Sequence, residues 1–307
     1  MRTPKLVFSI TTAMLLAGNS LVSADPLLPG AAYSTDVAVT GVAHQDYWIY
    51  EESPAGSGVL VQTDNALNLI SVSQGFSPGN VGGNVELFVL SDTATYTESY
   101  AAGSAFATAN SIHLTGTAGG LAFDFRSLNG QDWFFDGSSY NTTYGANNLA
   151  TRWFNDFSAY LATAGSPLGA IFSGNATVFN ALAGSGMFQT LSDPNIDYVY
   201  ALNNQLFFGL GDFLNETPRL KDLMTAAGYG SFTGLLPDGL QYSEVVILNG
   251  EVYYSFGSAV PSGVLLSDGS YDATTPFATP VPEPGSILLV ALGLSIRLMK
   301  RQRLVAA

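Results

Sequence analysis

Two aspartates beside an aromatic run are the residues whose types and spacing best suit chemistry. Asp132 and Asp136 stand on either side of Trp133, Phe134 and Phe135. An aromatic ring can stack on the apolar face of a sugar while nearby carboxylates accept hydrogen bonds from its hydroxyls. Asp132, Trp133 and Asp136 are therefore a candidate sugar contact, and a glycosidase would need such carboxylates about 5 to 10 Å apart. The same residues could form a buried aromatic plug with polar edges, and both interpretations stay open.

The histidines offer little further support for catalysis. His44 and His113 are the only two, and they stand far apart in the chain. His113 lies between Ile112 and Leu114 in an alternating stretch, which predicts a strand with the histidine on its solvent side. The sequence contains no cysteine and no His-Glu-x-x-His zinc motif. No catalytic residues and no metal site are assigned, and the chain is not expected to be an enzyme.

Calcium is the one cofactor for which the sequence offers candidate ligands. Asp and Asn side chains supply the oxygen atoms that calcium prefers, and they gather at 193–197 and 129–137. Neither stretch has the spacing of an EF-hand loop. Turn capping by Asp and Asn accounts for both stretches equally well, so no metal ligand is named.

The elements that would position these residues are mostly short strands. Alternating apolar residues between 31 and 130 predict half-buried antiparallel strands. Further on, the periodicity predicts helices at 149–164, 178–182 and 217–227, and hairpins at 196–210 and 245–254. Thr217 before Pro218 is a predicted N-cap, and Asn249-Gly250 is a strong hairpin turn. We expect a β-dominated α+β body of sandwich-like antiparallel sheets with two or three helices, whose halves on either side of residue 140 could be subdomains.

The N-terminus has the features of a secretory signal peptide. Arg2 and Lys5 precede the apolar run 6–17, and Val22-Ser23-Ala24 is a small-residue cleavage site. Residues 1–24 are therefore expected to be removed on export. The exported body is expected at 25–260, followed by a Ser-, Gly- and Pro-rich linker at 261–279.

The C-terminus has three features in a fixed order. Pro280, Pro282 and Pro284 predict an extended, accessible strip. An apolar run at 287–296 follows, about 15 Å long as a helix, which is short for a bilayer core of about 20 residues. Basic residues then mark a cytoplasmic end: Arg297, Lys300, Arg301 and Arg303.

This order resembles the C-terminal signal of PEP-CTERM proteins, with the sorting motif at Val281, Pro282, Glu283, Pro284 and Gly285. The resemblance implies a sorting tag at 280–303, with a short membrane helix at 286–299. It also implies processing by exosortase after transient membrane contact. The stretches 192–195 and 249–254 are similar to an uncharacterised group of PEP-CTERM proteins, which implies kinship and no activity.

The negative net charge of the chain is consistent with an extracellular protein. The formal net charge is −14, and the body carries only four basic residues: Arg126, Arg152, Arg219 and Lys221. Nucleic-acid binding needs clustered Lys and Arg, so that class is excluded. We expect an exported cell-envelope or extracellular-matrix protein with a structural or adhesive role, in contact with extracellular polysaccharide. The alternative is a secreted carbohydrate-binding or carbohydrate-active protein.

Overall fold

The computed structural model describes residues 30–43, 45–52, 60–63, 83–90, 100–213, 215–258, 260–265 and 271–279. The predicted signal peptide at 1–24 and the predicted tag at 280–303, with its membrane segment at 286–299, lie outside this part of the chain. His44 also lies outside it. Among the helices of the described ranges, none is both long enough and apolar enough to cross a membrane.

Twelve strands in the described ranges join one sheet, and all pairings between them are antiparallel. They are β1 (Ala32–Val39), β2 (Tyr47–Glu52), β3 (Leu60–Thr63), β4 (Gly83–Leu87), β5 (His113–Ala118), β6 (Leu121–Arg126), β7 (Asn195–Leu202), β8 (Gln205–Phe213), β9 (Val246–Leu248), β10 (Glu251–Tyr253), β11 (Val260–Leu265) and β12 (Tyr271–Ala278). Their order is β10-β9-β6-β5-β1-β7-β4-β2-β3, and β8, β12 and β11 branch from β7. Antiparallel pairing agrees with the sequence prediction.

Strand β1 connects two halves of this sheet. Its first residues pair with β7, and its later residues pair with β5. The register shifts near Asp36, whose positive φ of 52° is a conformation that Asp tolerates better than most residues. The two halves face each other across an apolar core, where the rings of Phe125 in β6 and Phe208 in β8 lie 5.1 Å apart. The sheet therefore folds over on itself.

Both predicted hairpins are confirmed. Strands β7 and β8 meet at Asn203-Asn204, and β9 and β10 meet at Asn249-Gly250. All four turn residues have positive φ, from 50° to 82°. Such turns match the twist of the strands that they join, and Asn and Gly adopt them at low cost.

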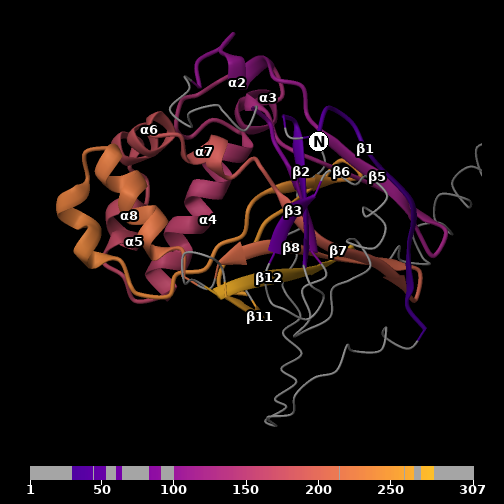
Figure 1. Cartoon of the computed structure of the whole chain (residues 1–307). Coiled ribbons are helices and arrows are strands. Elements are labelled where there is room, and N and C mark those ends of the chain that lie inside the picture. The colour runs from indigo at the N-terminus through magenta and orange to yellow at the C-terminus, as the bar shows by residue number, and fades with distance from the viewer. Residues whose placement is uncertain are drawn as a thin grey trace, which may run out of the picture.

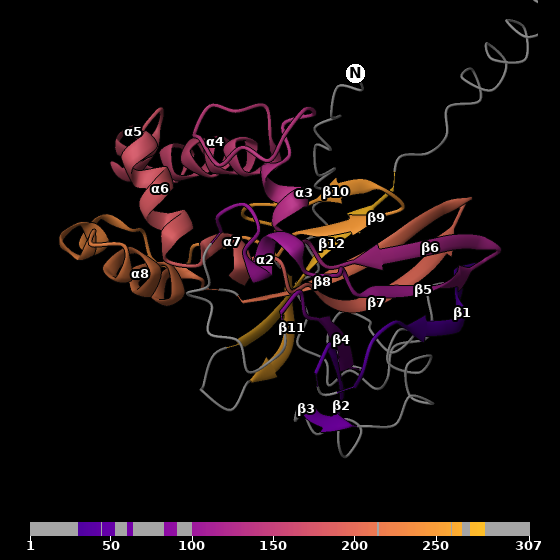
Figure 2. The same cartoon turned by 90° about the horizontal axis from the view of Figure 1, so that it is seen from above.

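Most of the helices gather at one end of the molecule, as the two views in Figures 1 and 2 show. They are α2 (Ala105–Thr108), α3 (Gly130–Phe134), α4 (Leu149–Thr163), α5 (Leu168–Phe172), α6 (Ala176–Gly184), α7 (Met187–Thr190), α8 (Thr217–Ala226) and the 3-10 helix η2 (Gly230–Leu235). The sequence predicted only two or three helices. Helices of four or five residues, such as α2 and α7, are too short to show an apolar period.

Helix α4 confirms the strongest helix prediction. The Asn148 side chain accepts a hydrogen bond from the Thr151 N–H and so caps the first turn. The helix buries Trp153, Phe154 and Phe157 on its apolar side. Its chain then turns at Gly165, which has a positive φ of 77°.

The predicted N-cap of α8 is corrected by one residue. Glu216 occupies the cap position, and Thr217 is the first residue of the helix. The Thr217 hydroxyl instead donates to the Pro237 carbonyl and accepts from the Leu240 N–H. The hydroxyl thus holds the 237–240 stretch against the start of α8.

The segment 261–279, predicted as a linker, contains strands in the structure. Strand β12 pairs with β8 from Asp272 to Ala278, and β11 pairs with β12. The Ser-, Thr- and Gly-rich composition resembles a linker, but the backbone satisfies its hydrogen bonds along β8. The folded body therefore continues to Thr279, whose N–H donates to the Leu206 carbonyl.

A division near residue 140 does not appear in the packing. Strand β9, from the second half of the chain, pairs with β6 from the first half. The helical core likewise combines Phe106 and Leu128 with residues that follow 140, such as Phe188. Each of the two cores therefore needs both halves of the chain.

Gly169 lies where α4 and α5 approach each other closely. A Cβ at this position would lie 2.6 Å from the Ala162 Cα, which is closer than folded proteins allow. Gly169→Ala is expected to destabilise the protein by about 1–3 kcal/mol because the two helices must move apart. Chemical denaturation measures the change.

The matched control is Gly234→Ala in η2, where a Cβ meets nothing within 4 Å. We expect this variant to lie within about 1 kcal/mol of the parent. Equal destabilisation by both substitutions would contradict the tight α4–α5 contact.

Candidate functional site

Trp133, the ring of the predicted sugar contact, lies in the core. It has no exposed surface, and its Nε1–H donates to the Ser192 hydroxyl at 2.7 Å. The Phe188 ring covers it, with centroids 4.8 Å apart. A sugar cannot stack on this ring without opening the core. The exposed ring of the run is Phe135 instead, with 48% of its surface accessible.

The two aspartates of the predicted contact make structural bonds. Asp132 caps α3 by accepting from the Asn129 N–H, and both of its oxygens accept hydrogen bonds from Arg126 at 2.6 and 2.7 Å. Asp136 organises a turn by accepting from Ser138, Ser139 and Asn141. These hydrogen bonds lower the pKa of Asp136. The geometry matches a buried aromatic plug with polar edges.

The 193–197 stretch, one of the two calcium candidates, is largely buried. Asp193 is 3% exposed, and its Oδ1 accepts from the Val89 N–H at 2.7 Å. Asp197 is 5% exposed. Within the residues that the structure describes, no three His, Asp or Glu side chains form a group that could hold a metal ion. The calcium hypothesis stays a prediction.

A cluster of charged residues that the sequence did not indicate surrounds Glu244, which is half-buried. The Glu244 carboxylate accepts hydrogen bonds from the Asn195 backbone N–H at 2.7 Å and from its side-chain amide. Loss of hydration raises the pKa of Glu244 well above its usual value, and Glu86 and Asp193 add to the rise. Arg219 and the Asn195 N–H oppose it. The environment therefore favours the protonated carboxyl group.

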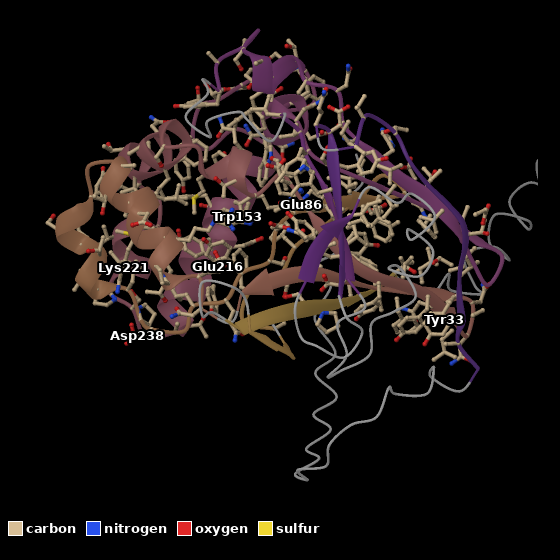
Figure 3. The ribbon with its side chains drawn as sticks, in the orientation of Figure 1. Tyr33, Glu86, Trp153, Glu216, Lys221 and Asp238 are labelled. Carbon is tan, nitrogen blue, oxygen red and sulfur yellow. The ribbon has the colours of Figure 1, made fainter. Side chains whose placement is uncertain are left out.

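Glu216 shares the same arginine. It is 2% exposed, and its Oε2 lies 3.8 Å from the Arg219 Nη1. Burial raises the pKa of Glu216, while Arg219 and a hydrogen bond with Tyr242 lower it. Glu216 lies at the helical end of the molecule, as do Lys221 and Asp238, whereas Glu86 lies nearer the strands (Figure 3). Arg219 thus lowers the pKa of two carboxylates, Glu216 and Glu244, that stand apart in the sequence.

His113 lies on the solvent side of β5, where the alternation predicted it. Its side chain is 35% exposed, and its Nδ1 lies 2.7 Å from the Asp124 Oδ1. No hydroxyl in the described part of the chain is hydrogen-bonded to the ring. The pair therefore lacks the nucleophile that a Ser-His-Asp triad requires.

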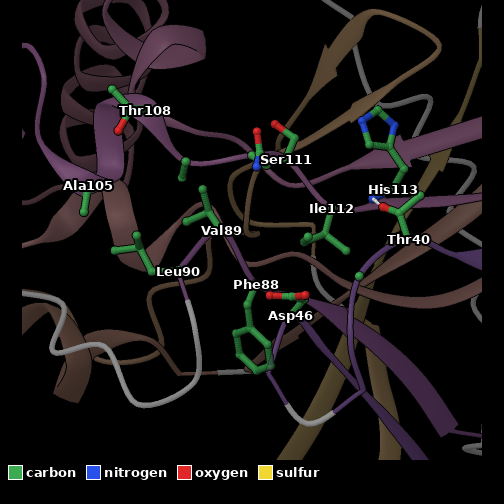
Figure 4. A pocket seen from close by; sticks show the side chains of 13 residues that line it. Thr40, Asp46, Phe88, Val89, Leu90, Ala105, Thr108, Ser111, Ile112 and His113 are labelled. Atoms are coloured by element: carbon green, nitrogen blue, oxygen red, sulfur yellow. Dashed lines mark hydrogen bonds between the residues drawn. The ribbon is translucent and has the colours of Figure 1, made fainter.

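A cavity of about 670 Å³ opens beside this strand. It lies between α2, the start of β5, the 88–90 segment and the residues Thr40, Gly41 and Asp46 (Figure 4). Polar lining comes from Thr40, Asp46, Thr108 and Ser111, and apolar lining includes Phe88 and Ile112. The residues are far apart in sequence, so no sequence signal could have identified this cavity.

Gly75-Phe76-Ser77-Pro78-Gly79 has the Gly-x-Ser-x-Gly spacing of a nucleophile elbow, and it lies outside the described residues. In that elbow the residue after the serine supplies a backbone N–H to the oxyanion hole. Pro78 has no N–H, so the pattern cannot complete this function.

The chain matches no family model, no curated protein and no solved structure in the comparisons made with each. The PEP-CTERM resemblance of the C-terminus therefore stays a prediction.

The Glu244 cluster predicts how stability depends on pH. The pKa of Glu244 is higher in the folded protein than its value of about 4.5 in the unfolded chain. Glu244 therefore contributes fully to stability below about pH 4.5, and this contribution is lost as the pH rises through the folded-state pKa. Glu244→Gln removes the ionisation and keeps an oxygen acceptor for Asn195. We expect its thermal midpoint to exceed that of the parent at pH 7–8, with a smaller loss of stability from pH 5 upward.

Glu251→Gln is the control because Glu251 is an exposed carboxylate on β10. It removes the same formal charge from an exposed position. If both variants changed the pH profile alike, the effect would be general charge repulsion and not the desolvation of Glu244.

Proposed function

We propose that this chain is an exported cell-envelope or extracellular-matrix protein with a structural or adhesive role. The observation that carries the proposal is the order of features after Thr279. The motif Val281–Gly285 is followed by the apolar run 287–296 and then by a basic tail. An extended strip, a short membrane segment and positive charges suit recognition and cleavage at a membrane surface.

The fold supports a boundary between body and tag at Thr279. The Thr279 N–H donates to the Leu206 carbonyl at 2.9 Å, and its hydroxyl accepts from the Leu206 N–H at 3.1 Å. The Gln205 side-chain amide donates to the Thr279 carbonyl. Pro280 follows directly. Cleavage within 282–285 would therefore leave every described strand intact.

The chemistry of the described charged groups supports a structural role over catalysis. Asp132 and Asp136 hold a helix start and a turn, and Arg126 pairs with Asp132. A negatively charged protein remains soluble outside the cell and can share divalent cations with acidic polysaccharide. A matrix role requires such surface chemistry and does not require a reaction.

The mass of the protein in its host tests the proposal. We expect the protein in the medium or at the cell surface to end between Pro282 and Gly285, with or without an attached group. Glu283→Ala removes the only charge of the Pro-Glu-Pro triplet and is expected to leave the chain unprocessed in membranes. Intact-mass spectrometry of membrane and medium fractions measures both.

Glu251→Ala is the matched control and should be processed like the parent. Recovery of the parent only from membranes, with its C-terminus still at Ala307, would overturn the proposal.

A further inference from the structure

We propose that the cavity beside α2 binds a neutral sugar unit of an extracellular polysaccharide. The inference rests on the proposed matrix role for the identity of the polymer, but the cavity itself is independent of the tag. It differs from the sequence-based sugar contact because it includes none of Asp132, Trp133 and Asp136.

The size and form of the cavity suit a small ligand that belongs to a larger chain. Its volume of about 670 Å³ falls within the roughly 300–1,000 Å³ of small-molecule sites. It is open to solvent and not enclosed, so one unit of a polymer can enter while its neighbours remain outside. Three separate segments form its walls, and each is tied to the fold by hydrogen bonds. Phe88 bonds to Asp46, Thr40 to His113, and Ile112 to Ser127.

The polar lining offers both donors and acceptors, as hydroxyl groups require. Thr40 Oγ1 accepts from the His113 N–H at 2.9 Å, and Ser111 Oγ accepts from Arg126 at 3.1 Å, so each keeps a hydroxyl hydrogen to donate. Asp46 Oδ2 accepts from the Val42 N–H at 2.7 Å, and the carboxylate has further lone pairs. Neighbouring sugar hydroxyls donate and accept at once, and such a mixed lining matches them.

The charge of the cavity limits the class of ligand that it can bind. Asp46 is the carboxylate of the lining, in a chain of net charge −14, so an acidic sugar would be repelled. Figure 4 shows Asp46 near Phe88, with Ile112 on the same side. Phe88 and Ile112 line the cavity but are only 4% and 8% exposed, so hydrogen bonds from the polar lining would provide most of the contact with a sugar. A neutral sugar matches the volume, the mixed polar lining and the charge of the cavity.

Binding of simple glycosides to the full-length chain tests the inference. The probes are the methyl glycosides of glucose, mannose and galactose, with glucuronate as the acidic counterpart. We expect saturation-transfer NMR to detect at least one neutral glycoside and not glucuronate. Asp46→Asn keeps an acceptor for the Val42 N–H and should weaken binding roughly tenfold, because a hydrogen bond to a charged acceptor is lost.

Ala105→Trp is a second variant that does not depend on Asp46. Ala105 is exposed at the start of α2 and lines the cavity, so a large side chain can occupy the space without entering the core. We expect this variant to lose binding while it keeps the thermal midpoint of the parent. Asp238→Asn, at the distant helical end, removes one carboxylate and should bind like the parent (Figure 3).

No signal from any neutral glycoside, equal binding of glucuronate, or unchanged binding by Ala105→Trp would overturn the inference. Polysaccharide from the native host should compete with the bound glycoside. Absence of competition would contradict the proposal that the bound sugar unit belongs to an extracellular polysaccharide. None of these outcomes depends on C-terminal processing, so they are distinguishable from failure of the proposed function.

Discussion

Packing of aromatic rings around Phe188 is the interaction on which the helical part of this protein depends. Phe188 lies in a helix of four residues, and its ring is 4.8 Å from Trp133, 5.4 Å from Phe134 and 5.7 Å from Phe179. Helices this short are not stable alone, because their few hydrogen bonds do not offset the cost of nucleation. Aromatic pairs add about 0.5–1.5 kcal/mol beyond their buried area. The rings therefore hold short helices that local sequence preference would leave unformed.

The same core determines where charge can be placed. With few cations in the body, Arg126 and Arg219 both turn toward partners in the fold: Arg126 makes two bonds to Asp132, and Arg219 lies among Glu216, Glu244 and their neighbours. Removing such carboxylates from water is costly unless they are paired, hydrogen-bonded or protonated. The packing thus raises the pKa of Glu216 and Glu244, because it removes both carboxylates from water.

The sites differ in how far the sequence could indicate them. The acidic and aromatic run at 132–136 suggested a sugar contact by residue type, but the structure buries Trp133 and uses both aspartates for local bonds. The cavity was invisible because its walls at 40–46, 88–90 and 105–113 meet only in three dimensions. Residue types near one another in sequence can suggest chemistry, whereas exposure depends on what the rest of the chain covers.

Local patterns in the sequence predicted the antiparallel strands, helix α4 and the turns at Asn203-Asn204 and Asn249-Gly250, because period and turn preference are local properties. The sequence also predicted export and sorting from both termini, which the described residues do not include. The tertiary structure was needed to show that β11 and β12 pair within 261–279, that Trp133 is covered and that Arg219 influences the ionisation of Glu244. Strand pairing, burial and charge contacts depend on partners distant in sequence, and no local pattern specifies those partners.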